Sequence, residues 1–210
     1  MKTLKTWAAA AAMVALSGAA DATPVFQGRR ADGTASATCT VSGATKCAMF
    51  YNTTLDVTIL NDWNIGTGFW SATAAAGSAH ALAASAGAAQ TDFTGWFLPT
   101  GDGFSGARAL NQYLSIWNDV GSSLAGLLSQ FDGVRSDFYW SGTEYAPDPD
   151  SAWFFFTFTG EQLYLDKSRA LYAVAVRPGD VAASVPEPQT LALALLALGA
   201  TVVARRRRSR

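Results

Sequence analysis

Three acidic side chains that lie close together are the strongest candidates for chemistry in this chain of 210 residues. Glu144, Asp148 and Asp150 fall in one proline-containing stretch, and Trp140 and Trp153 flank it. Two carboxylates can act as the acid and base of a glycosidase when they face each other across a sugar. Acids this near in one loop usually face solvent, where they can contact a sugar or Ca²⁺. We therefore predict that these five residues bind a ligand and do not catalyse a reaction.

No other group of residues has the composition of a catalytic centre. His80 is the only histidine, and no cysteine or acid is near it in the sequence. The sequence therefore offers no partner residues for a catalytic triad or a metal site that would include His80. The stretch from Gly101 to Gly106 has the spacing of a dinucleotide-binding turn, but a parallel βαβ unit does not follow it. We expect that the protein is not an enzyme and has no cofactor other than a weakly bound Ca²⁺.

Cys39 and Cys47 are the only two cysteines. In an oxidising compartment such a pair tends to form a disulfide. The bridge would close a short loop around Gly43 and contribute about 2 to 3 kcal/mol, which fixes a local turn and not the whole fold. A zinc site is the alternative, but two thiols without a nearby histidine or third cysteine bind zinc poorly.

The first 22 residues have the layout of a secretory signal peptide. Lys2 and Lys5 precede an apolar run over 7–16, and Ala20-Asp21-Ala22 provides small residues before Thr23. A buried alanine-rich helix is the alternative, but positive charge ahead of a short apolar run at the terminus favours the signal peptide. We expect the mature protein to begin near Thr23.

A second apolar segment lies at the other end of the chain. Pro186-Glu187-Pro188 precedes sixteen uncharged residues over 189–204, and a run of arginines follows them. A helix of that length spans about 24 Å, which crosses a hydrocarbon core of about 30 Å only if its flanking side chains snorkel. The positive-inside rule keeps the arginines in the cytoplasm and places the middle of the chain outside. A permanent membrane anchor would explain the run and the arginines but not the prolines.

These three parts, in this order, resemble the PEP-CTERM sorting signal of exported bacterial proteins. In that family an exosortase, a membrane protease-transpeptidase, recognises the tail and removes or exchanges it. The resemblance implies an exosortase partner, transient anchoring in the inner membrane, and delivery to the cell surface or the extracellular matrix. The residues that it assigns to the signal are Pro186, Glu187, Pro188, Arg205, Arg206, Arg207 and Arg208.

The charge of the middle of the chain argues against a nucleic-acid partner. The whole chain has 15 basic and 16 acidic residues, but the stretch from Thr23 to Val185 has eight basic and fourteen acidic ones. A surface of this sign repels phosphate backbones. Half of all residues are apolar, and the chain has 7 tryptophans and 12 phenylalanines, so a folded domain with its own core is expected.

Residue patterns predict a mixture of helices and strands around the candidate residues. A β-branched run predicts a strand over 55–60, an alanine-rich run predicts a helix over 71–89, and the residues before Pro99 are expected to be extended. Ser105 is predicted to cap a helix that continues through Trp117, and Leu124, Leu127 and Leu128 suggest another helix. Aromatic and β-branched runs predict antiparallel strands over 138–141, 152–159, 162–165 and 171–177, with a tight turn at 159–161.

Several blocks of this middle region resemble the Lcl C-terminal-like domain, a family named after a bacterial collagen-like adhesin. The resemblance implies the α+β class: a compact C-type-lectin-like domain with helices packed on a small antiparallel sheet, flanked by a signal peptide and a C-terminal membrane helix. In that family the segment at 96–99 usually reads Trp-Arg-Leu-Pro. Phe97 replaces the arginine here, so a salt bridge made by that arginine would be absent. The matching blocks lie at 50–58, 95–100, 139–145, 152–155 and 173–179.

The sequence thus predicts four parts. They are a signal peptide over 1–22, an N-terminal segment with the disulfide over 23–48, an Lcl C-terminal-like domain over 49–180, and a PEP-CTERM sorting signal with a transmembrane helix over 181–210. We expect an exported adhesion module that binds a polysaccharide or a matrix protein. An enzyme-like domain with hydrolytic or oxidative activity and a purely structural matrix protein remain as alternatives.

Overall fold

The computed structural model describes residues 24–103 and 110–184. These residues form two sheets, three α-helices and a final 3₁₀ turn, so the expected mixture of helix and strand is observed. The predicted signal peptide, the Ser105 cap and the C-terminal apolar run lie outside the described residues. In the described ranges, no helix has both the length and the apolar character needed to cross a membrane.

The first sheet is antiparallel throughout and has the strand order β1-β2-β3-β9. β3 is buried along its whole length, which explains its continuous run of apolar and β-branched residues. β1 and β2 are four residues each, and no pattern in the sequence predicted them. The strands are β1 (Phe26–Arg29), β2 (Met49–Asn52), β3 (Val57–Leu60) and β9 (Val176–Pro178).

The second sheet has the strand order β4-β8-β5-β6-β7. Its neighbours are antiparallel except β5 and β8, which meet in parallel where Tyr139 pairs with Tyr172. The predicted strand over 171–177 is wrong as a single element, because residues 173–175 cross from this sheet to the first one and leave two short strands. The strands are β4 (Thr67–Gly68), β5 (Phe138–Glu144), β6 (Ser151–Phe156), β7 (Gln162–Asp166) and β8 (Leu171–Tyr172).

Two predicted helices begin later than expected. α1 (Ala79–Gln90) starts after Ser78, whose hydroxyl accepts a hydrogen bond from the Ala81 N–H, because Ala74 and Gly77 have positive φ and turn the preceding residues away from helix. α2 (Gln112–Asp119) begins after Asn111, whose side-chain oxygen accepts a hydrogen bond from the Leu114 N–H. α3 (Leu124–Gln130), capped by Ser123, lies where the leucine spacing predicted a helix.

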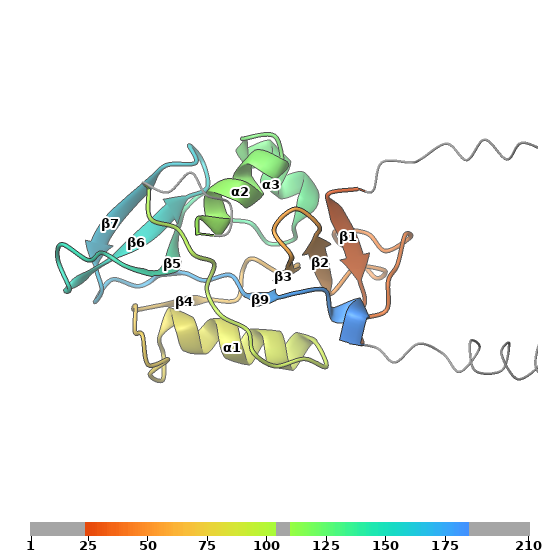
Figure 1. The fold of residues 1–210 in the computed structure, drawn as a ribbon, viewed down its shortest axis with the longest axis horizontal. Coiled ribbons are helices and arrows are strands. Elements are labelled where there is room, and N and C mark those ends of the chain that lie inside the picture. The colour runs from red at the N-terminus through yellow and green to blue at the C-terminus, as the bar shows by residue number, and fades with distance from the viewer. Residues whose placement is uncertain (1–23, 104–109, 185–210) are drawn as a thin grey trace, which may run out of the picture.

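Helices cover both sides of the strands (Figure 1). α2 and α3 lie on one side, where the buried rings of the first core include Trp63, Tyr113, Trp117, Tyr139, Phe131 and Phe155. α1 lies on the other side and packs small residues against a second core that contains Trp70, Trp96, Trp140 and Phe154. The described residues thus contain two sheets and two apolar cores, one on each side of the strands.

The two ends of the described domain lie together. β1 and the 3₁₀ turn η1 (Val181–Ser184) are neighbours at one end of the longest axis, and β7 lies at the opposite end (Figure 1). The chain therefore enters and leaves the folded body on the same side.

Candidate binding surface and sorting junction

The loop that begins at Glu144 and contains Asp148 and Asp150 is called here the acidic loop. Lys167, which directly follows β7, binds this loop. The Lys167 ammonium lies 2.6 Å from a Glu144 carboxylate oxygen, donates to the Pro149 carbonyl, and sits 4.6 Å from the centre of the Trp70 ring. Glu144 is therefore paired with a cation and is not a free carboxylate. A glycosidase pair needs two carboxylates facing one sugar, and this contact gives Glu144 a structural partner instead.

Asp148 stabilises the same loop through short-range hydrogen bonds. Its carboxylate accepts hydrogen bonds from the Ser151 hydroxyl at 2.8 Å and from the Asp150 N–H at 3.2 Å. This arrangement is an Asx-type turn, in which the Asp148 carboxylate accepts a hydrogen bond in place of a backbone carbonyl. Asp150 is exposed on the same loop. The structure thus places Glu144, Asp148 and Asp150 on one surface and gives the first two structural contacts.

The two predicted tryptophans are core side chains. Trp140 is fully buried, and its indole N–H donates to the Gly68 carbonyl at 3.0 Å and the Arg169 carbonyl at 3.2 Å. The expectation that Trp140 contacts a ligand does not fit this burial. Trp153 is 5% exposed, so only its edge is near the surface.

Two tyrosines that sequence reasoning missed form the exposed aromatic surface beside this loop. The rings of Tyr145 and Tyr164 stack with centroids 3.8 Å apart and planes 4° apart, and both meet the Trp153 ring edge-on. Tyr164 is 48% exposed. We call these three residues the tyrosine platform. The predicted turn at 159–161 would place residue 158 opposite 162, whereas residues 157–161 join β6 to β7 and Trp153 pairs with Tyr164, so this contact does not follow from the predicted turn.

The described residues offer no ready metal centre. Within 24–103 and 110–184, no three His, Cys, Asp or Glu side chains gather in a way that could hold a metal ion. His80 is half-buried and packs edge-on against Trp70, with ring centroids 5.0 Å apart. Burial lowers the pKa of His80, which favours the neutral imidazole. The Ca²⁺ expectation stays a prediction.

Cys39 and Cys47 form a disulfide with Cα atoms 5.1 Å apart. The bridge packs on β1 at Gly28, where a Cβ atom would lie 2.5 Å from the Cys39 sulfur. Glycine is required at this position because any side chain would collide with the bridge. The disulfide thus fixes the loop against the first strand of the domain.

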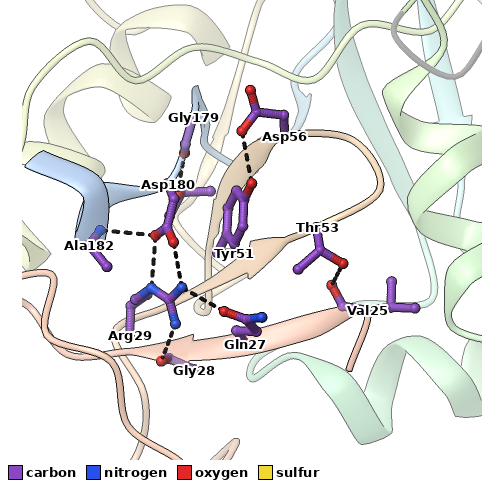
Figure 2. Close-up of polar contacts among 11 residues, drawn as sticks. Val25, Gln27, Gly28, Arg29, Tyr51, Thr53, Asp56, Gly179, Asp180 and Ala182 are labelled. Carbon is purple, nitrogen blue, oxygen red and sulfur yellow. Dashed lines mark hydrogen bonds and ion pairs between the residues drawn. The ribbon is translucent and has the colours of Figure 1, made fainter. Parts of the chain in front are cut away.

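A buried ion pair joins the two ends of the domain (Figure 2). Arg29 in β1 donates from Nε to one Asp180 oxygen at 2.8 Å and from Nη2 to the other at 2.6 Å. Nη2 also donates to the Gln27 side-chain oxygen at 2.8 Å, and Nη1 donates to the Gly28 carbonyl at 3.1 Å. The guanidinium also lies 5.5 Å from the centre of the Tyr51 ring. This two-point geometry fixes the position of Asp180 relative to β1.

Asp180 also starts the last turn of the domain. Its carboxylate accepts a hydrogen bond from the Ala182 N–H at 2.9 Å, at the start of η1 (Figure 2). Burial alone would raise the pKa of Asp180, but the hydrogen bonds from Arg29 and Ala182 and the guanidinium charge outweigh it, so the pKa lies below its ordinary value. The carboxylate is therefore charged at neutral pH and holds η1 beside β1.

The segment that continues from η1 matches a known family. The PEP-CTERM protein-sorting motif aligns with residues 184–208. The chain carries a PEP-CTERM sorting motif. The aligned stretch contains Pro186-Glu187-Pro188 and Arg205 to Arg208, which lie outside the described residues. The motif indicates an exported protein that an exosortase sorts to the cell surface. No curated protein matches the chain.

Proposed function

We propose that the PEP-CTERM protein presents its domain at the cell surface or in the matrix, where the tyrosine platform binds a polysaccharide without catalysis. Aromatic rings offer a flat apolar face with a polar edge, and sugar sites combine such faces with a few polar groups. Here the exposed Tyr164 ring lies beside a loop with three acids. If the ligand were a matrix protein, or if the role were purely structural, the tyrosine platform would bind no sugar.

The single observation that supports this function best is the placement of the platform relative to η1, after which the sorting motif follows in the sequence. The tail continues from η1, and β7 with Tyr164 lies at the other end of the longest axis (Figure 1). A protein held at the surface through that end of its body would direct the platform away from its attachment. This is the arrangement that an adhesion module needs.

The fold of the domain supports a proposal about its family as well. We infer that the domain is of the Lcl C-terminal-like, C-type-lectin-like kind, with residues 49–180 as its main part. Its support is the set of sequence blocks described above, together with helices packed on antiparallel strands and chain ends that lie together.

A glycan array with residues 24–184 tests the function. We expect saturable binding to at least one polysaccharide, with no product formed. Tyr164→Ala should weaken binding about tenfold, which corresponds to about 1.4 kcal/mol. Phe158→Ala is the matched control, because Phe158 is an exposed aromatic residue near β6 and outside the platform, and it should leave binding unchanged.

Three results would contradict the proposal. Absence of binding to any glycan would favour the structural or protein-binding alternatives. An equal loss in both variants would remove the platform as the site. Formation of a product would support the enzyme-like alternative. Repeating the array with a chelator tests the Ca²⁺ prediction, which requires that binding falls when Ca²⁺ is removed.

A further inference from the structure

Tyr145 and Tyr164 form a stacked pair of phenol rings at the surface. Their centroids lie 3.8 Å apart, and the two ring planes differ by 4°. Aromatic pairs in proteins usually have centroids about 4.5 to 7 Å apart, so these two rings overlap face to face more closely than most. Tyr164 is 48% exposed and Tyr145 is half-buried, so small molecules in solution can reach the pair.

The surroundings hold both rings in place. The Trp153 ring meets the Tyr145 ring edge-on at a centroid distance of 5.3 Å and the Tyr164 ring at 5.9 Å. The Tyr145 N–H donates to the Ser151 carbonyl at 3.1 Å, and the Tyr145 carbonyl accepts from the Asp148 N–H at 3.0 Å. Tyr164 lies in β7, where it pairs with Trp153 of β6. The fold itself therefore brings the two rings together.

The two hydroxyl groups lie at the same end of the stack. Burial raises the pKa of the Tyr145 hydroxyl, and its hydrogen bond to the Tyr164 side chain and the charge of Asp148 raise it further. Tyr145 is therefore a neutral phenol at pH 7. Because the rings are parallel and their hydroxyls are neighbours, the ortho carbons beside the hydroxyls also face each other.

We propose that Tyr145 and Tyr164 are a site of oxidative cross-linking, at which a peroxidase and hydrogen peroxide join the two rings as dityrosine. Each phenol gives up one electron and its hydroxyl proton, and the radicals that result carry unpaired spin on their ortho carbons. The two radicals combine in a carbon–carbon bond between ortho carbons, and the hydrogen on each of these carbons then moves to oxygen, which restores two phenols. The peroxide takes up the two electrons and two protons and becomes two molecules of water.

The other four tyrosines lack this arrangement, and all six lie in the part of the chain that the structure describes. Tyr139 and Tyr172 are a second pair, but their centroids are 5.5 Å apart, their planes differ by 31°, and Tyr139 is fully buried. Tyr113 is also fully buried. Tyr51 lies in the first sheet and donates its hydroxyl to Asp56. An oxidant should therefore couple residue 145 with residue 164 and leave the other four uncoupled.

The new bond would join the acidic loop to β7. It would close the chain between residues 145 and 164, across the intervening strand β6. A covalent bridge that closes a loop of this length restricts the unfolded chain as a disulfide does. The cross-linked protein should therefore unfold about 5 to 10 °C higher than the untreated protein.

Limited oxidation of the surface-extracted protein with a haem peroxidase and hydrogen peroxide tests the site. We expect dityrosine fluorescence in protein that stays monomeric. Tandem mass spectrometry should find residues 145 and 164 in one linked pair of peptides, lighter by two hydrogen atoms than the separate peptides. The yield should stay the same when the protein is diluted about tenfold, because coupling within one chain needs no encounter between chains.

Tyr145→Phe and Tyr164→Phe keep a stacked pair of rings but remove one hydroxyl, so each should lower the dityrosine yield about tenfold or more. Tyr172→Phe is the matched control, because it also removes the hydroxyl of a half-buried tyrosine, and it should leave the yield unchanged. Thermal unfolding of each untreated variant verifies that it is folded.

Several results would overturn the proposal. Absence of dityrosine, a linked pair made of other tyrosines, or dityrosine found only in covalent dimers would show that the stack does not direct the coupling. Equal yields in Tyr164→Phe and in the native protein would show the same. The inference uses the tyrosine platform but not its ligand, so a platform that binds no glycan can still be cross-linked, and the two proposals fail separately.

Discussion

Arg29 is a charged side chain at only 3% exposure, and its burial is tolerable because each of its three guanidinium nitrogens donates at least one hydrogen bond. Moving a charge out of water costs several kcal/mol, and a well-placed ion pair with further hydrogen bonds offsets that cost. Asp180 provides the opposite charge from the far end of the sequence, 151 residues away. The pair therefore links the first strand to the last turn of the domain.

Asp180→Asn should destabilise the domain by about 3 kcal/mol at pH 7, because it keeps the shape of the side chain but leaves Arg29 buried without a counter-charge. The pKa of Asp180 is lowered in the folded state, so its contribution is complete above the unfolded pKa of about 4 and is lost as pH falls through the folded pKa. The difference between native and variant in urea unfolding should therefore shrink toward pH 3.

Asp150→Asn is the control for this experiment, because Asp150 is exposed on the loop between β5 and β6. It should change the unfolding free energy by less than about 0.5 kcal/mol. An Asp180→Asn deficit that is the same at pH 3 and pH 7 would show that the lost interaction does not depend on the carboxylate charge.

Within α1, the packing of Gly87 against Trp96 outweighs helix propensity. A Cβ atom at Gly87 would lie 2.1 Å from Cγ of the Trp96 ring. Gly87→Ala should therefore destabilise the domain by about 1 to 3 kcal/mol in thermal or urea unfolding, although alanine is the better helix former by about 1 kcal/mol. The comparison is Ala84→Gly at an exposed position of α1, which should lose only about 1 kcal/mol. A Gly87→Ala variant more stable than the native domain would contradict this account of the packing.

The sequence predicted elements whose signals are local and missed those that depend on distant partners. The strands β5 to β7 and the helix α3 follow from alternating aromatics and leucine spacing, but β6 ends at Phe156 and residues 157–161 join it to β7, where the sequence predicted a strand to 159 and a turn at 159–161. β1, β2 and β4 are too short for a periodic signal. The run over 55–60 predicted the strand β3 but not its pairing with β9, which lies more than a hundred residues away. The acidic loop was found, but its pairing with Lys167 and the Tyr145–Tyr164 stack depend on cross-strand register.

For the whole molecule, changes in the sorting tail should affect processing but not the stability of the folded domain. The two cores described above are built from residues in 24–103 and 110–184, and the sorting motif occupies 184–208. Replacing Pro186, Glu187 and Pro188 with alanines should therefore leave the unfolding free energy unchanged within about 0.5 kcal/mol but block processing in a host that has an exosortase. In surface-extracted protein, mass spectrometry should detect peptides from 191–205 in the triple variant and not in the native protein.

Asp180→Asn tests the reverse separation. It should lower the stability of the domain, while the exosortase should still process those molecules that fold. Retention of those peptides in the native protein would instead indicate a permanent anchor, and a loss of stability in the triple variant would show that the tail contributes to the fold.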